Sequence, residues 1–176
     1  MSLIVWFTGL SGAGKSTLCC AVYSKLKQRQ IPVSVLDADV VRQHLSRDLG
    51  YSPGDRAENM RRISHAAKEL SRDGTIVLVA AISPYQAIRS EIRRHHAFFI
   101  EVFVNAPLEV CERRDPKGLY RKARAGLIKD FTGISAPYEN PTNPDVECKT
   151  DKESIETSSA KIIAVIEQVM NTRRAD

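Results

Sequence analysis

A glycine-rich segment near the start of the chain limits its possible folds more than any other feature. It matches the pattern GxxxxGK[ST] at every fixed position, and it consists of Gly9, Leu10, Ser11, Gly12, Ala13, Gly14, Lys15 and Ser16. An apolar run, Leu3–Thr8, precedes the segment, and a helical pattern follows it. A strand that leads through such a turn into a helix is the context in which this motif holds phosphate, because backbone N–H groups converge on one point. We therefore predict a phosphate-binding loop.

The chemistry of this loop rests on two side chains. Lys15 can reach the β- and γ-phosphates of ATP, and the Ser16 hydroxyl can ligate Mg²⁺. We predict that the whole loop and the next residue, Thr17, bind ATP. GTPases and ATP-driven machines also carry such loops. However, the 176 residues contain no NKxD-type guanine-reading segment and leave no room for a motor or transporter domain. Small-molecule kinases are therefore the favoured class.

Apolar runs and helical patterns alternate along the rest of the chain. Further strands are predicted over Val33–Leu36, Ile76–Ala81 and Phe99–Val104, with a weaker one near Val146–Lys149. Helices are predicted over Lys15–Arg29, Ala57–Asp73 and Glu153–Met170. Continuously apolar strands are typical of a sheet covered on both faces. We predict an α/β, three-layer P-loop NTPase fold with a mostly parallel five-stranded sheet, helices on both faces and ligands at the carboxyl ends of the strands.

One segment interrupts this alternation. Residues 115–143 are rich in Lys, Arg, Gly and Pro and poor in apolar side chains. That composition favours a mobile basic lid over a phosphate site. Because the chain shows no second such alternation and no repeat, we predict a single domain over residues 1–176 that includes the lid.

Charge and cysteine content narrow the choice of partners and compartment. Lys and Arg number 26 against 21 Asp and Glu, a formal charge of +5, which fits either an ordinary basic surface or polyanionic ligands. The chain contains no block of five or six consecutive basic residues, so nucleic-acid binding is not favoured. No apolar run approaches the roughly 20 residues that span a membrane. The four cysteines form no CxxC pair, and the first residues lack a basic n-region. We expect free thiols and a cytoplasmic protein.

Two carboxylates follow the second predicted strand. Asp37 and Asp39 stand two residues apart, and residues i and i+2 of a strand share a face. On this interpretation Asp37 holds Mg²⁺ with Ser16, and Asp39 accepts the proton of the attacking hydroxyl. The alternative is that one of the two caps the next helix.

Strings between residues 3 and 145 resemble the adenylylsulfate kinase family. They comprise Asp37–Arg42, Arg47–Pro53, Asp55–Arg56, Glu58–Arg62, Ile82–Tyr85, Glu109–Glu112, Asp115–Tyr120 and Phe131–Ile134. The chain departs from the family pattern at Ala38, Val40, Tyr51, Ala81 and Leu127, none of which removes a charged ligand-binding side chain.

The resemblance implies a reaction and its residues. The γ-phosphoryl group of ATP would move, with Mg²⁺, to the 3′-hydroxyl of adenosine 5′-phosphosulfate (APS) in sulfate assimilation. Residues expected to hold APS are Asp39, Arg42, Tyr51, Arg56, Asn59, Ile82, Ser83, Lys117, Phe131 and Thr132. Arginines suit phosphate and sulfate oxygens, and Tyr51 and Phe131 suit the adenine ring, although a solvated helix face or core packing would also explain these residue types. Lid residues Arg121 and Arg124 are expected near the ATP base.

Further expectations come with the family. Lys15, Asp37, Asp39 and Ser83 are the candidate catalytic residues. Descriptions of the family give the serine a phosphorylated intermediate. Because no histidine lies near Ser83 in sequence to act as its base, we expect direct transfer instead. A homodimer and association with ATP sulfurylase are also implied. A shikimate-type or nucleotide kinase and a non-catalytic nucleotide-binding module are the alternatives.

Overall fold

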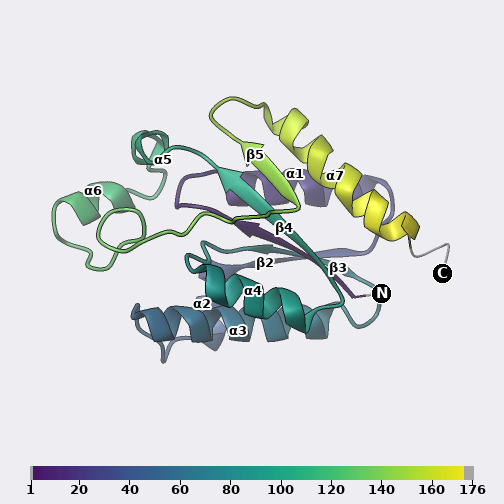
Figure 1. Ribbon diagram of the computed structural model, residues 1–176, viewed down its shortest axis with the longest axis horizontal. Helices are drawn as coiled ribbons and strands as arrows, with labels where there is room; N and C mark the ends of the chain where they lie inside the picture. The colour runs from purple at the N-terminus through teal and green to yellow at the C-terminus, as the bar shows by residue number, and fades with distance from the viewer. Residues whose placement is uncertain (1, 173–176) are drawn as a thin grey trace.

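A computed structural model describes residues 2–172 of the chain as a five-stranded, all-parallel sheet between two helical layers (Figure 1). The strand order is β2-β3-β1-β4-β5. The strands are β1 (Leu3–Thr8), β2 (Val33–Asp37), β3 (Ile76–Ala80), β4 (Phe98–Asn105) and β5 (Val146–Lys149). Their carboxyl ends therefore meet at one edge of the sheet. No helix among residues 2–172 is long and apolar enough to span a membrane.

Helices cover both faces of this sheet. Helices α1 (Lys15–Gln28) and α7 (Ile155–Thr172) pack on one face, and α2 (Ala38–Leu45), α3 (Pro53–Leu70) and α4 (Gln86–His95) pack on the other (Figure 1). Short helices α5 (Leu108–Arg114) and α6 (Leu119–Arg124) follow β4. The predicted three-layer α/β fold is confirmed, and the sheet is wholly parallel.

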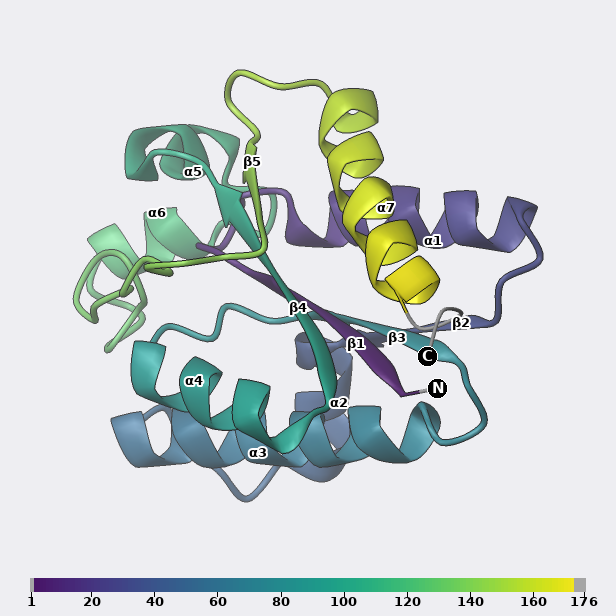
Figure 2. The same cartoon turned by 45° about the vertical axis from the view of Figure 1, so that its right-hand side comes forward.

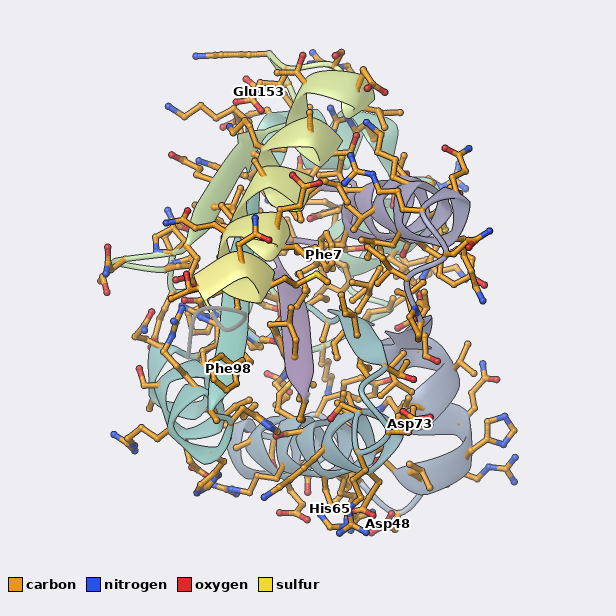
Figure 3. All side chains as sticks on the ribbon, turned by 90° about the vertical axis from the view of Figure 1, so that its right-hand side faces the viewer. Phe7, Asp48, His65, Asp73, Phe98 and Glu153 are labelled. Carbon is orange, nitrogen blue, oxygen red and sulfur yellow. The ribbon has the colours of Figure 1, made fainter. Side chains whose placement is uncertain are left out.

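Alternation along β1 divides the apolar core between these two layers. Leu3, Val5 and Phe7 pack with α1 and α7, whereas Ile4 and Trp6 pack with α2, α3 and α4. All five side chains are fully buried, which explains the continuously apolar sequence of this strand. Figure 3 shows Phe7 in the interior beside α7, while His65 on α3 lies at the outer surface.

The predicted elements match the observed ones to within one residue for every strand and a few residues for the three helices. Four shorter helices, α2, α4, α5 and α6, were not predicted. Helix α4 carries few apolar side chains, with Ile88 and Ile92 buried, and α5 and α6 are only 7 and 6 residues long. Such short or polar sequences lack the repeated apolar stripe by which a helix is recognised.

The lid segment lies beyond the carboxyl ends of the strands. It begins after α5, contains α6 and is otherwise irregular, and Figure 2 shows it extending away from β1 and β4. Arg114, just before the segment, donates to the carbonyls of Gly12 and Thr150. Near its other end, the Glu139 backbone N–H donates to the Pro84 carbonyl over 2.8 Å. Both ends are thus fixed to the sheet edge.

The junction of β1 with the phosphate loop tolerates no side chain. A Cβ at Gly9 would lie 2.4 Å from the carbonyl oxygen of Val104 on β4, at a φ of +155°. A backbone atom cannot move away from such a contact without disturbing the sheet. Gly126 in the lid makes a useful contrast, because its φ is also positive at +73° but a Cβ there meets nothing within 4 Å.

We expect Gly9→Ala to lower the free energy of unfolding by about 3 kcal/mol or more, the sum of backbone strain and over-packing. Gly126→Ala should cost only the strain of the left-handed backbone, roughly 1–2 kcal/mol. Urea denaturation of the nucleotide-free protein measures both values. Equal losses in the two variants would contradict the close contact between Gly9 and β4.

Candidate active site

A large cleft opens at the carboxyl edge of the sheet. Its volume is about 510 Å³, and it is bounded by the phosphate loop, the ends of β2 and β3, the lid and the segment after β5. Predicted site residues that line it are Ser11, Gly12, Gly14, Lys15, Ser16, Thr17, Asp37, Asp39, Ile82, Lys117 and Phe131. The cleft thus joins most of the predicted phosphate loop to four of the predicted acceptor residues, Asp39, Ile82, Lys117 and Phe131.

The phosphate loop encloses its own lysine. The Nζ of Lys15 donates to the carbonyl oxygens of Gly9 over 3.0 Å and Leu10 over 2.8 Å. Removal of the amine from water lowers the pKa of Lys15 to about 8, even though Asp39 nearby opposes the change. The lid contributes here too, because the Tyr120 hydroxyl donates to the Ser11 carbonyl over 2.9 Å. The amine therefore lies against the loop, and an incoming phosphate would compete with the Gly9 and Leu10 carbonyls for it.

Asp37 is the last residue of β2 and the N-cap of α2. One of its oxygens, Oδ1, accepts from the backbone N–H of Asp39 over 2.9 Å, and Oδ2 accepts from the Ser16 hydroxyl over 3.4 Å. Asp39 lies in the first turn of α2, so the idea that the pair shares one face of a strand is wrong. The capping alternative holds for Asp37, because its carboxylate satisfies a free N–H at the helix start.

The Ser16 and Asp37 oxygens suit Mg²⁺. Mg²⁺ in nucleotide sites commonly takes one or two protein oxygens and completes its shell with phosphates and water. The hydroxyl and carboxylate meet at the lip of the cleft, beside the phosphate loop. Within residues 2–172 no cluster of three or more His, Cys, Asp or Glu forms a separate metal site.

Asp39 pairs with a residue of the lid. Its Oδ2 accepts a hydrogen bond from the Nζ of Lys117, and that bond raises the pKa of the lysine. Both side chains are more than half exposed, so this contact contributes little to stability. It does place a cation from the lid at the carboxylate predicted to accept a proton.

Two arginines flank Tyr51 beside the cleft. The Arg42 guanidinium lies 4.2 Å from the centre of the Tyr51 ring and that of Arg56 lies 5.6 Å from it. Arg56 also donates to the hydroxyl of Thr132 over 3.0 Å and to the Asp130 carbonyl. Arg56 thus connects the segments that carry Tyr51 and Phe131, the two aromatic residues predicted to hold the adenine ring.

Asn59 carries an unused acceptor. It lies on α3 and is 4% exposed, and its Oδ1 has no hydrogen-bond partner within residues 2–172. A buried polar atom without a partner costs free energy, so such an atom suits a ligand that donates a hydrogen bond.

Phe131 makes an edge contact with Tyr120, with ring centres 5.0 Å apart.

Ser83 lies behind the cleft wall instead of on its surface. It is fully buried, and its Oγ accepts from the Trp6 indole over 2.7 Å. The same hydroxyl lies 3.2 Å from the Met60 sulfur. Its backbone φ of +50° is unusual for a residue with a side chain. Within residues 2–172, the Ser83 hydroxyl has no histidine or carboxylate partner that could act as its base.

Two residues of the cleft, Arg114 and Thr150, were missed from the sequence. Arg114 donates to the Gly12 and Ala13 carbonyls and to Thr150, and Thr150 follows β5. The rule that ligands meet the carboxyl ends of strands could have found Thr150. Eleven predicted site residues do not line the cleft: Gly9, Leu10, Ala13, Arg42, Tyr51, Arg56, Asn59, Ser83, Arg121, Arg124 and Thr132. Among them, Arg124 pairs with Glu112.

Comparisons with known proteins identify this arrangement. The family model "Adenylylsulphate kinase" matches residues 1–149. The adenylyl-sulfate kinase of Synechococcus sp. (strain JA-2-3B'a(2-13)) is 65% identical over 151 residues, which are 86% of each chain. The structure of the Mycobacterium tuberculosis APS kinase in complex with AMPPNP and APS is 49% identical, with a TM-score of 0.91 over 94% of this chain and 98% of that one.

A more distant likeness sets the limit of the fold comparison. A gluconokinase from Sinorhizobium meliloti is 14% identical, with a TM-score of 0.62 over 98% of this chain and 96% of that one, and shows the common fold alone. The family model and the identities to the relatives are far stronger than that. The chain therefore belongs to the adenylylsulfate kinase family of P-loop kinases.

Proposed function

We propose that this protein transfers the γ-phosphoryl group of ATP to the 3′-hydroxyl of APS and releases ADP and 3′-phosphoadenylyl sulfate. Family membership carries the proposal. The continuity of one cleft from the phosphate loop to Ile82 and Phe131 supports it, because a donor and an acceptor must meet in line.

The chain's own groups divide the work of transfer between charge and proton movement. Lys15 and the loop N–H groups would stabilise negative charge on the phosphates as it shifts toward ADP. Asp39, at the start of α2, would accept the proton of the 3′-hydroxyl as that oxygen attacks phosphorus. Lys117 would leave Asp39 for a phosphate once both substrates are bound.

Mg²⁺ would be held by Ser16 and Asp37 together with the ATP phosphates, and it would neutralise charge on them. Asp37 is suited to this task since its cap to Asp39 fixes the direction of its second oxygen. The same cap couples the metal side of the site to the proton acceptor.

Recognition of APS would fall to residues near α3 and the lid. Arg42 and Arg56 supply planar guanidinium groups for phosphosulfate oxygens, and Tyr51 between them supplies an aromatic face. Asn59 supplies an acceptor that lacks a protein partner within residues 2–172. Thr132 is held in place by Arg56.

The acceptor is tested by ADP release coupled to a spectroscopic assay with APS, shikimate, gluconate and AMP at equal concentrations. We expect ADP release with APS alone among these four compounds. Release driven by another acceptor, with none from APS, would overturn the assignment.

The proposal also covers the domain, compartment, oligomeric state and protein partner of the enzyme. We propose a single catalytic domain over residues 1–176 in the cytoplasm, a homodimer, and association with ATP sulfurylase, which would supply APS. The three buried cysteines, Cys19, Cys111 and Cys148, fit a reducing compartment because each is a free thiol. Light scattering would measure the oligomeric state.

Asp39→Asn and Asp37→Asn form a matched pair of conservative changes. We expect Asp39→Asn to lower kcat by about 10²–10⁴-fold with little change in the KM for APS, because an amide cannot accept the proton. Asp37→Asn should instead raise the Mg²⁺ concentration needed for half-maximal rate. Steady-state kinetics over a Mg²⁺ series separates the two effects. A full kcat in Asp39→Asn would remove it from the proton-transfer role.

Ser83→Ala should remain active, because its hydroxyl is bonded within the core and faces no base in the described part of the chain. Chirally labelled γ-phosphoryl ATP should give product with inverted configuration at phosphorus, as one displacement requires. Retained configuration, or a phosphoprotein that disappears in Ser83→Ala, would indicate a serine intermediate instead.

Binding of a nucleotide should recharge Lys15 at high pH. Its pKa in the free protein is about 8, and a nearby phosphate stabilises the charged amine and raises that value. At pH 9 AMPPNP binding should therefore take up a proton, while at pH 7 Lys15 is already charged and takes up none. Calorimetry in two buffers of different ionisation enthalpy measures this uptake. Uptake at pH 9 that persists in Lys15→Met would assign the proton to another group.

A further inference from the structure

The acceptor end of the cleft is built from two segments that lie far apart in sequence. One follows β3 and contains Ile82 and Ser83, and the other is the part of the lid that runs from Phe131 to Glu139. Their relative position therefore depends on contacts between them. The Glu139 N–H donates to the Pro84 carbonyl over 2.8 Å, and its carboxylate accepts from the Gln86 N–H at the start of α4 over 2.6 Å.

Arg89 on α4 contacts both segments at once. One of its terminal nitrogens donates to the Ser83 carbonyl over 2.5 Å, and the other donates to the Glu139 carbonyl over 2.6 Å. Its guanidinium also lies 5.7 Å from the centre of the Tyr138 ring. Arg89 is only 2% exposed, so it does not reach the protein surface and would not contact a substrate directly.

The charge of Arg89 is compensated inside the protein. Its Nε lies 3.0 Å from Oε1 of Glu101 on β4, although the two are not aligned as a hydrogen bond, and Glu101 is 4% exposed. Arg93, one turn further along α4, lies 3.5 Å from the other oxygen of Glu101. A buried ion pair is a weak source of stability compared with an apolar pair of the same size. An apolar residue could replace the ion pair, but it could not donate hydrogen bonds to the carbonyls of Ser83 and Glu139.

We propose that Arg89 is a positioning residue for the acceptor, which sets the distance between the two segments that form the APS end of the cleft. This inference rests on the proposed function. Ser83 has a positive φ, so its carbonyl points where an unconstrained chain would not direct it, and the guanidinium holds it there. The same guanidinium binds the Glu139 carbonyl and so fixes the end of the segment that contains Phe131 and Thr132. ATP binds at the opposite end and does not depend on this link.

The test compares Arg89→Met, the double variant Arg89→Met with Glu101→Gln, and Arg93→Met as the matched control. Arg93 shares the Glu101 partner and the helix, but it has no contact with Ser83 or Glu139 in the described residues. The double variant also removes the charge of Glu101, which would otherwise lose its nearer arginine partner, so we expect it to stay folded if Arg89→Met alone unfolds. Each variant is measured for thermal midpoint, KM for ATP, and kcat/KM for APS.

We expect the variants that lack Arg89 to lose about 10- to 100-fold in kcat/KM for APS while the KM for ATP stays unchanged, as a small displacement of a reacting group predicts. Arg93→Met should lower the thermal midpoint without this selective loss. Wild-type kcat/KM for APS in the double variant, or an equal loss in Arg93→Met, would overturn the positioning role. Failure of the wild-type protein to use APS would instead overturn the proposed function.

Discussion

The parallel direction of all five strands is the constraint from which the site follows. Every strand ends at the same edge of the sheet, so each loop that follows a strand begins beside the others. The phosphate loop after β1, Asp37 at the end of β2, Ile82 after β3 and Thr150 after β5 line one cleft for that reason. An antiparallel strand in this sheet would have sent one of these groups to the opposite edge.

The charged groups of the site have hydrogen-bond partners within the protein. Lys15 is held by its own loop carbonyls, Asp39 by Lys117, and Arg56 by the Thr132 hydroxyl and the Asp130 carbonyl. Substrates must therefore exchange contacts instead of meeting empty charges. Because each exchange replaces one hydrogen-bond partner by another, specificity depends on the geometry of these groups more than on net charge.

Sequence reasoning predicted the fold well where residues repeat and poorly where they do not. The buried strands and the three long helices are recognised from apolar runs and stripes in the sequence. The phosphate loop is recognised from its glycines and Lys15. The geometry of Asp37 and Asp39 was missed because the strand ends between them. A spacing of two residues cannot tell a strand from a strand that becomes a helix.

Long-range contacts of the site had no local signal either. Arg89 and Arg114 are ordinary basic residues in sequence, and only the fold brings the first to Glu139 and the second to Thr150. By contrast, the acceptor residues came from strings that resemble a known family, and their individual roles remain predictions. Composition could not have found them, because arginines also occur widely on protein surfaces that bind no ligand.

The lid is fixed at both ends, by the Arg114 contacts with Gly12 and Thr150 and by the Glu139 contact with Pro84. Between these ends the lid is held by side-chain contacts of Tyr120 with Ser11, Lys117 with Asp39 and Thr132 with Arg56, which must break before it can swing. Because the stretch between the two ends contains both Lys117 and Phe131, which line the cleft, one displacement of it would uncover both the donor and the acceptor region. Departure of the two products would then be governed by a single gate, and a change in the stiffness of that gate would alter the release of both products together.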